Sequence, residues 1–244
     1  HGVTTGAPVA LRIGNSEWPK WETVMSADPV DPSALLIDAG TGDEREISRN
    51  RPLTRPRPGH ADLPGMLSYD LPEARPVLER ASARETAARV ALGVLAEALL
   101  DQVAGVGLVS HVVSVGGQRA TASVLPTPAD EAALCEASMR ALDPADNARF
   151  EAAVDAAKHA GDTIGGVAEV IAYGVPVGLG THVSARERLD ARLAAALMSI
   201  QSVKGVEIGD GFAQAALLGS QAHDEIVRGP DDHLTRTSNH AGGI

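Results

Sequence analysis

An α+β fold is compatible with the order of helices and strands that the sequence predicts. Apolar side chains recur at three- and four-residue spacing from about Pro76 to Val103, which is typical of a long helix with one apolar face. A valine-rich run over residues 106–115 predicts a strand, which Gly116 and Gly117 end. Neither a repeat nor a charged linker divides the sequence, so a single domain over residues 1–244 is expected.

Two further helices carry start signals in the sequence. Asp143 supplies the side-chain oxygen of an N-cap and Pro144 tolerates the first helical position, so a helix is predicted as far as Ala160. Ser184 and Glu187 have the spacing of a capping box, which predicts a helix to about Ile200. The remaining expected elements are strands at 8–13, Val167–Tyr173 and near Val203–Ile208, a short helix after Asp210, and an irregular tail.

The composition restricts what the protein can do. Hydrophobic residues make up 44% of the 244 residues but aromatic residues only 2%, so the core must consist of Ala, Val, Leu and Ile. The formal net charge of −11 argues against general binding to nucleic acid or to anionic lipid. The longest apolar stretch, Val90–Leu100, contains Glu97 and is too short for a membrane span. With a single cysteine and no secretory signal, we expect a cytoplasmic protein.

Arginines, one histidine and one hydroxyl gather in two short segments. Residues 49–65 interleave arginines with prolines, which predicts a stiff loop, and His60 lies at its end after Pro-Gly and two residues before Asp62. Arg80, Ser82 and Arg84 fall in the first turns of the predicted long helix, where free N–H groups favour anions. This combination predicts a site for a multiply anionic small molecule, with one histidine as its proton partner.

Some features of the sequence have other interpretations. The arginine loop also fits a solvated basic face or a contact with RNA, although single-stranded RNA recognition usually adds stacking aromatics that this segment lacks. Gly178-Leu179-Gly180 lacks the third glycine of a dinucleotide fold, and no histidine pair has the spacing of a metal site, so no metal is expected. His111, within the valine-rich run, is expected to be a partly buried structural histidine.

Five motifs occur in an order that resembles the chorismate synthases, most closely the bacterial form. They lie at residues 55–62 (RPRPGHAD), 79–86 (ERASARET), 161–166 (GDTIGG), 201–209 (QSVKGVEIG) and 238–243 (SNHAGG). The resemblance covers nearly the whole chain and is weakest from Arg119 to Ala133. It implies an α+β sandwich of core helices between two antiparallel β-sheets, assembled as a homotetramer.

The resemblance also implies an activity. Chorismate synthases are lyases of the shikimate pathway of aromatic amino acid biosynthesis. They form chorismate from 5-enolpyruvylshikimate 3-phosphate by a 1,4-anti elimination of phosphate that needs reduced FMN (FMNH2). The resemblance thus implies a cytoplasmic flavoprotein associated with NADP, acting on a small molecule and on neither nucleic acid nor a membrane. Whether the protein reduces its flavin itself or receives it from an external flavin reductase is left open by the sequence.

Site residues carry over by position within the matching motifs. His60 matches a catalytic histidine, and Arg57, Ser82 and Arg84 match substrate-binding positions. Two segments match flavin-contacting positions, the first comprising Arg80, Ala81 and Ser82 and the second comprising Gln201 and Ser202.

The domain is expected to be incomplete at both ends. The family's Gly-Glu-Ser-His-Gly motif, with a second catalytic histidine, would precede His1, and an Arg-Ser-Asp motif would follow Ile244. The 244 residues alone are therefore predicted to bind flavin poorly and not to turn over. The alternative is a truncated, non-catalytic relative that acts as a scaffold or binding module.

Overall fold

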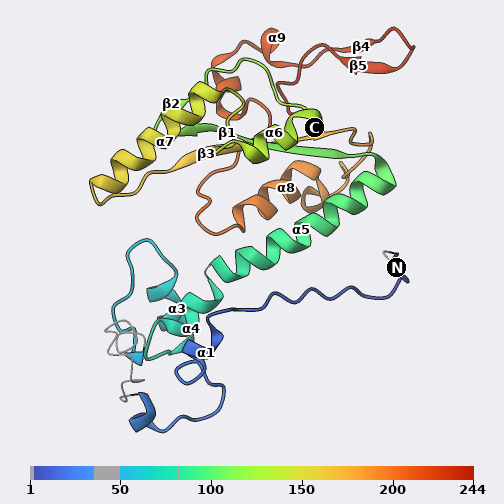
Figure 1. Cartoon of the computed structure of the whole chain (residues 1–244). Helices are drawn as coiled ribbons and strands as arrows, with labels where there is room; N and C mark the ends of the chain where they lie inside the picture. The colour runs from blue at the N-terminus through green and yellow to red at the C-terminus, as the bar shows by residue number, and fades with distance from the viewer. Residues whose placement is uncertain (1–2, 36–49, 82) are drawn as a thin grey trace. The chain divides into compact units, whose positions relative to one another are not determined.

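A computed structural model describes residues 3–35, 50–81 and 83–244, in which helices accompany two small antiparallel sheets (Figure 1). The chain divides into two units by its internal contacts. One unit combines residues 1–92 with residues 182–244, and the other comprises residues 93–181. Two segments that lie far apart in the sequence therefore fold into the same unit.

The unit of residues 93–181 contains a three-stranded antiparallel sheet in the order β2-β1-β3. Its strands are β1 (Gly107–Val115), β2 (Gln118–Arg119) and β3 (Gly166–Tyr173). Gly116 and Gly117 both have positive φ, of 56° and 80°, which glycine tolerates and which lets the chain reverse between β1 and β2. The strands predicted at 106–115 and 167–173 are thereby confirmed.

Helix α7 (Pro144–His159) packs on this sheet and supplies its core. The predicted N-cap is confirmed, because an Asp143 side-chain oxygen accepts a hydrogen bond of 2.8 Å from the backbone N–H of Ala145. Phe150 is fully buried, and the residues around it are small or aliphatic: Val112, Val115, Ala120, Met139 and Ala141. The same unit holds η2 (Pro128–Asp130) and α6 (Glu131–Glu136).

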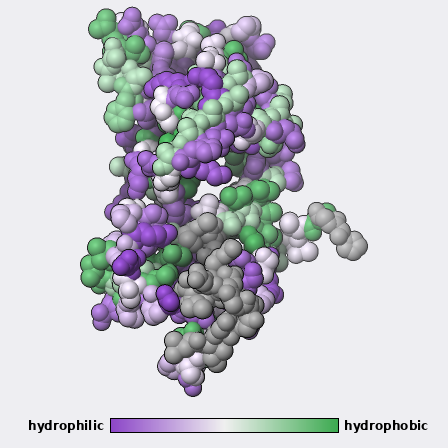
Figure 2. Space-filling view, turned by 60° about the vertical axis from the view of Figure 1, so that its left-hand side comes forward, coloured by the Kyte–Doolittle hydropathy of each residue, from purple (hydrophilic) through white to green (hydrophobic). Residues whose placement is uncertain are grey.

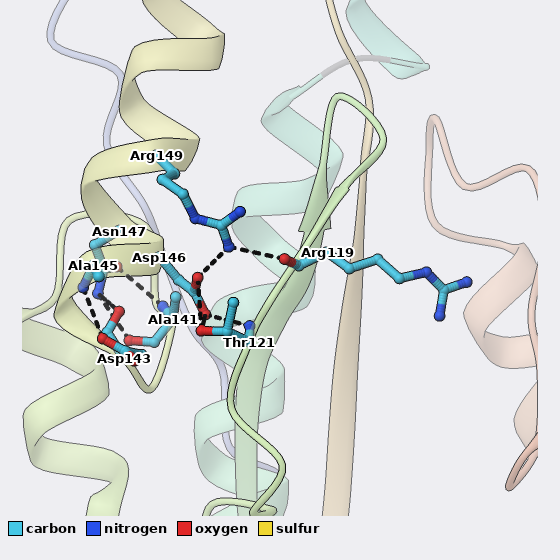
Figure 3. A network of polar contacts seen from close by, with 8 residues as sticks. All are labelled: Arg119, Thr121, Ala141, Asp143, Ala145, Asp146, Asn147 and Arg149. Carbon is cyan, nitrogen blue, oxygen red and sulfur yellow. Dashed lines mark hydrogen bonds and ion pairs between the residues drawn. The ribbon is translucent and has the colours of Figure 1, made fainter.

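A buried carboxylate ties the segment after β2 to the first turns of α7 (Figure 3). Asp146 has no exposed surface and accepts hydrogen bonds from the backbone N–H (2.7 Å) and the hydroxyl (3.1 Å) of Thr121. Arg149 points toward Asp146, pairs with it, and also donates to the backbone oxygen of Arg119 at 2.9 Å. These contacts satisfy the buried charge, and they fix a segment in which the sequence motifs are weakest.

The other unit contains the remaining elements of the described residues. Its helices are α1 (Trp18–Trp21), α3 (Asp62–Tyr69), α4 (Arg75–Arg80), the first part of α5 (Ala83–Ala104), α8 (Leu189–Met198) and α9 (Gly219–Ala222), with 3₁₀ turns η1 (Pro32–Leu35), η3 (Ala185–Glu187) and η4 (Gly211–Ala216) and a hairpin of β4 (Ile226–Arg228) and β5 (Leu234–Arg236). Helix α3 packs tightly on α4, because a Cβ added at Gly65 would lie 2.6 Å from a methyl carbon of Val77. That contact fixes α3, the helix that directly follows the loop containing His60.

Several sequence predictions in this unit were wrong. Residues 8–13 and 203–208 form no strand, because among the described residues neither segment pairs with a neighbouring strand, and a strand is not stable alone. The long helix predicted from Pro76 is two helices, since Ala81 leaves helical geometry (φ −98°, ψ 27°) between α4 and α5. The β4–β5 hairpin replaces part of the tail that was expected to be irregular.

The capping box predicted at Ser184 does not form. The Ser184 side chain makes no capping hydrogen bond, and the segment that follows it is only the short turn η3. Arg188 then adopts an extended conformation (φ −61°, ψ 138°), so that α8 begins at Leu189. A capping box depends on the chain continuing as a helix, and here an extended residue interrupts it.

Apolar side chains are also left at the surface. On α5, Val90, Val94 and Leu99 are each about 60% exposed or more, so the described residues do not cover the apolar face that their spacing predicts. Figure 2 shows apolar patches between polar ones on the face that it presents. Among the described helices, none has the combination of length and apolarity that crossing a membrane requires.

The core around Phe150 yields a test of the fold. Replacing Phe150 with Ala in the protein expressed from its complete reading frame should lower the free energy of unfolding by about 3–5 kcal/mol, because a fully buried ring leaves a cavity. Val154→Ala, on the same helix at a position 39% exposed, should cost less than about 1 kcal/mol. Urea denaturation of both variants measures the difference, and equal losses would contradict the described packing.

Candidate functional site

The loop before α3 is organised around a buried carboxylate. Asp62, the first residue of α3, is only 2% exposed. Its two oxygens accept hydrogen bonds of 2.9 Å each from Nε and Nη2 of Arg57, and one of them also accepts from the Arg57 backbone N–H at 3.0 Å. This bidentate pair fixes the orientation of the guanidinium.

The pair lowers the pKa of Asp62 and leaves part of the Arg57 guanidinium exposed. The side-chain hydrogen bonds from Arg57 lower the pKa of Asp62 from 3.8 to about 2, against the opposing effect of its burial. The Arg57 side chain remains 46% exposed, so its other guanidinium hydrogens face solvent. An arginine held on one edge and open on the other can still bind an anion.

His60 lies between these two residues and is exposed. Its Nδ1 lies 2.9 Å from the backbone oxygen of Pro58. The contact orients the ring, because an Nδ1 that carries a hydrogen can donate it to this carbonyl oxygen. Gly59, with φ of +70°, allows the tight turn that brings the ring back to Pro58. The loop therefore presents an exposed imidazole three residues after an oriented arginine.

The second predicted segment lies between α4 and α5. Arg80 is the last residue of α4 and is exposed, as is Ala81 after it. Ser82 lies outside the described residues. Arg84 belongs to the first turn of α5, but its side chain lies outside what the structure describes.

The third predicted segment, the turn after α8, is hydrogen-bonded to the start of α5. The Gln201 side-chain amide donates to a carboxylate oxygen of Glu85 at 2.6 Å and accepts from the Thr86 hydroxyl at 3.0 Å. Arg89 donates to the other oxygen of Glu85 at 2.6 Å and to the Ser199 hydroxyl at 2.7 Å. The turn that carries Gln201 is thus hydrogen-bonded to helix α5, which begins just after Arg80 and Ala81.

Charge and backbone geometry are unusual at this junction. The hydrogen bond from Gln201, followed by that from Arg89, lowers the pKa of Glu85, so the carboxylate is ionised at neutral pH. Ser202 adopts a left-handed conformation with φ of +71°, which is uncommon for a residue other than glycine. Such conformations cluster at ligand-binding sites, and Ser202 is exposed.

A further polar cluster holds the last motif in place. Asp224 accepts hydrogen bonds from the Ser238 hydroxyl (2.6 Å) and from the backbone N–H groups of His240 (2.7 Å) and Ala241 (3.0 Å), and the bond from Ser238 is the largest cause that lowers its pKa to about 2. A Cβ at Gly209 would lie 2.1 Å from the His240 backbone oxygen, so only glycine fits there. No group of metal-ligating side chains occurs within the described ranges.

Sequence reasoning found the arginines, His60 and Gln201 but missed the groups that hold them. Asp62 was noted only for its closeness to His60, and Glu85, Thr86 and Ser199 were not assigned any role. A signal for one of them was available, since Glu85 and Arg89 have the i,i+4 spacing of a helical ion pair. Among the described residues, no hydrogen bond or ion pair links the loop that carries His60 to the turn that carries Gln201.

The described residues thus hold the Arg57 guanidinium and the Gln201 amide in fixed orientations, and Ser202 follows Gln201 with a positive φ. The chorismate synthase family model matches residues 1–244. Chorismate synthases from Beutenbergia cavernae and Streptomyces coelicolor are 59% and 58% identical to the chain, with all of this chain aligned. The chain therefore belongs to the chorismate synthase family.

The same comparisons confirm the fold class and bound how much of a relative this sequence represents. A crystal structure of a chorismate synthase is 39% identical, with a TM-score of 0.69 over 75% of this chain and 58% of that one, which confirms the α+β class. The chain spans about 60% of the length of the relatives from Beutenbergia cavernae and Streptomyces coelicolor (60% and 59%).

The Arg57–Asp62 pair predicts a pH-dependent contribution to stability. Because the folded-state pKa is depressed, the contribution is present above the unfolded pKa of 3.8 and is lost as pH falls through about 2. Asp62→Asn should therefore lower the free energy of unfolding at pH 7 by about 1–2 kcal/mol, allowing for the half-exposed arginine.

The control is Asp70→Asn, which removes the same charge from the exposed residue that ends the same helix. Urea denaturation should show a loss for Asp62→Asn at pH 7 that shrinks toward pH 2, and little change for Asp70→Asn. A loss that does not depend on pH would contradict the ion-pair assignment.

Proposed function

We propose that the protein containing this chain is a chorismate synthase, which eliminates phosphate from 5-enolpyruvylshikimate 3-phosphate in the shikimate pathway to aromatic amino acids. Family membership over all 244 residues supports this function. The observation that carries it is the junction of Gln201 with Glu85 and Thr86, because it joins one flavin-matching segment to the helix that follows the other. This contact is expected if the two motifs, which lie far apart in the sequence, bind the same ligand.

The residues at this junction fit reduced FMN. Arg80 offers an exposed guanidinium, and Ser202 offers an exposed hydroxyl on a strained turn, which are donors suited to an anionic cofactor. Ala81 and Ser82 complete the first segment, and Gln201 the second. Bound there, reduced FMN would lend electron density to the breaking C–O bond, with no net redox change in the reaction.

Arg57, Arg84 and Ser82 are proposed to bind the substrate's carboxylates and phosphate. Arg57 is held by Asp62, so its free edge is oriented before the substrate arrives, which reduces the entropy lost on binding. His60 is proposed as an acid–base group that exchanges a proton through Nε2, because Nδ1 is engaged with Pro58. The oriented arginine and the histidine lie in one short loop.

Several properties of the whole protein belong to the same proposal. They are a single domain that extends beyond both ends of residues 1–244, a homotetramer, a cytoplasmic location, an association with NADP, reduced flavin supplied by an external reductase, and no nucleic acid or membrane as partner. A non-catalytic scaffold is the competing function. An anaerobic assay with reduced FMN and 5-enolpyruvylshikimate 3-phosphate separates the two, since an enzyme releases chorismate and phosphate in equal amounts and a scaffold releases neither.

His60→Ala tests the proposed acid–base role in the protein expressed from its complete reading frame. The variant should lower kcat by about 10²–10⁴-fold, the usual contribution of a general acid–base group. The control is His159→Ala, an exposed histidine at the end of α7 in the other unit, which should keep the parental rate. Stopped-flow measurement of chorismate formation gives both rates, and a His60→Ala rate equal to that of the control would remove His60 from the mechanism.

A further inference from the structure

The side-chain amide of Gln201 is already occupied by protein groups. Its nitrogen donates to Glu85 at 2.6 Å and its oxygen accepts from Thr86 at 3.0 Å. Glu85 and Thr86 are adjacent on the first turns of α5, so one short stretch of helix grips both ends of the amide. Gln201 and Glu85 are partly buried, which limits competition from water for these bonds.

A second pair of bonds braces the same turn. Arg89 lies one helical turn after Glu85, donates to its free oxygen at 2.6 Å, and reaches the Ser199 hydroxyl at 2.7 Å. Glu85 therefore accepts from two donors on opposite sides and cannot rotate without breaking one bond. The turn from Ser199 to Gln201 is held at two points, and Ser202 is the next residue along the chain.

We propose that Glu85 and Thr86 are positioning residues for the flavin site, and that Gln201 acts there as their tether while the adjacent Ser202 makes the flavin contact. This inference rests on the proposed function. It assigns two new residues to the site and gives Gln201 a structural role there, because one N–H and one lone pair of its amide are held by the helix. The left-handed conformation of Ser202 agrees with it, since two tethers just before a residue can hold it in a strained geometry.

The proposal predicts that Thr86 and Gln201 act through each other. Thr86→Val keeps the shape of the side chain and removes the hydroxyl, and Gln201→Met keeps the length and removes the amide. Each should raise the Kd for reduced FMN by about 5- to 10-fold, the factor expected for the loss of one hydrogen bond. The double variant should bind no more than about twofold more weakly than the weaker single variant, because both changes cut the same tether.

The tests use the protein expressed from its complete reading frame, with anaerobic titration of reduced FMN followed by its fluorescence. Thr86→Ser should restore the parental Kd within about twofold, because it returns the hydroxyl. Thr86→Val should raise the flavin concentration needed for half-maximal activity by about the same factor as its Kd, because the loss lies in binding. The stability control is Asp143→Ala, which removes the N-cap of α7 in the other unit and should leave the Kd unchanged.

Each outcome decides a separate point. Full additivity of Thr86→Val and Gln201→Met would mean that the two side chains act independently of each other, and it would overturn the tether. A Kd that rises equally in Asp143→Ala would show that the effect is general destabilisation, which also overturns it. If the parental protein neither binds reduced FMN nor forms chorismate, the proposed function itself fails, and the tether fails with it.

Discussion

The carboxylate of Glu85 is the contact on which the described arrangement of the site depends. It accepts from Gln201 and from Arg89, each at 2.6 Å, and so links helix α5 to a turn more than a hundred residues later. Bonds to an ionised oxygen are shorter and stronger than neutral ones, and the lowered pKa of Glu85 keeps it ionised at neutral pH. One side chain therefore sets where two distant motifs meet.

The His60 loop follows the same physical logic with a different carboxylate. Asp62 is buried at the start of α3 and forms an ion pair with Arg57. This pairing offsets the cost of burying the carboxylate and holds the arginine in one orientation. In both places a carboxylate holds a basic or amide group in one orientation.

Local signals predicted the elements that local interactions decide. The N-cap at Asp143, the glycine pair after β1 and the valine-rich strands were all readable, because capping, positive φ and periodicity depend on neighbouring residues. The strands predicted at residues 8–13 and 203–208 do not form, because a strand needs a partner strand that a local pattern does not supply. The capping box predicted at Ser184 does not form, because Arg188, four residues later, has an extended conformation. The β4–β5 hairpin was missed because its strands are very short.

The sequence singled out residues of the candidate site but not the groups that hold them. Motif resemblance pointed to His60, Arg57 and Gln201, but the bonds from Gln201 to Glu85 and Thr86 join positions whose separation carries no periodic signal. Long-range polar contacts of this kind depend on how helices pack, which a single sequence does not encode in a readable pattern.

The central claim is that one flavin site is built from the Arg80 segment and the Ser202 turn, beside an acid–base histidine. A crystal structure of the protein from its complete reading frame, with FMN and substrate bound, tests it most directly. The account predicts that the flavin contacts both Arg80 and Ser202, that Nε2 of His60 faces the ligands, and that the Gln201 amide still bonds Glu85. A flavin bound away from these two segments would contradict it.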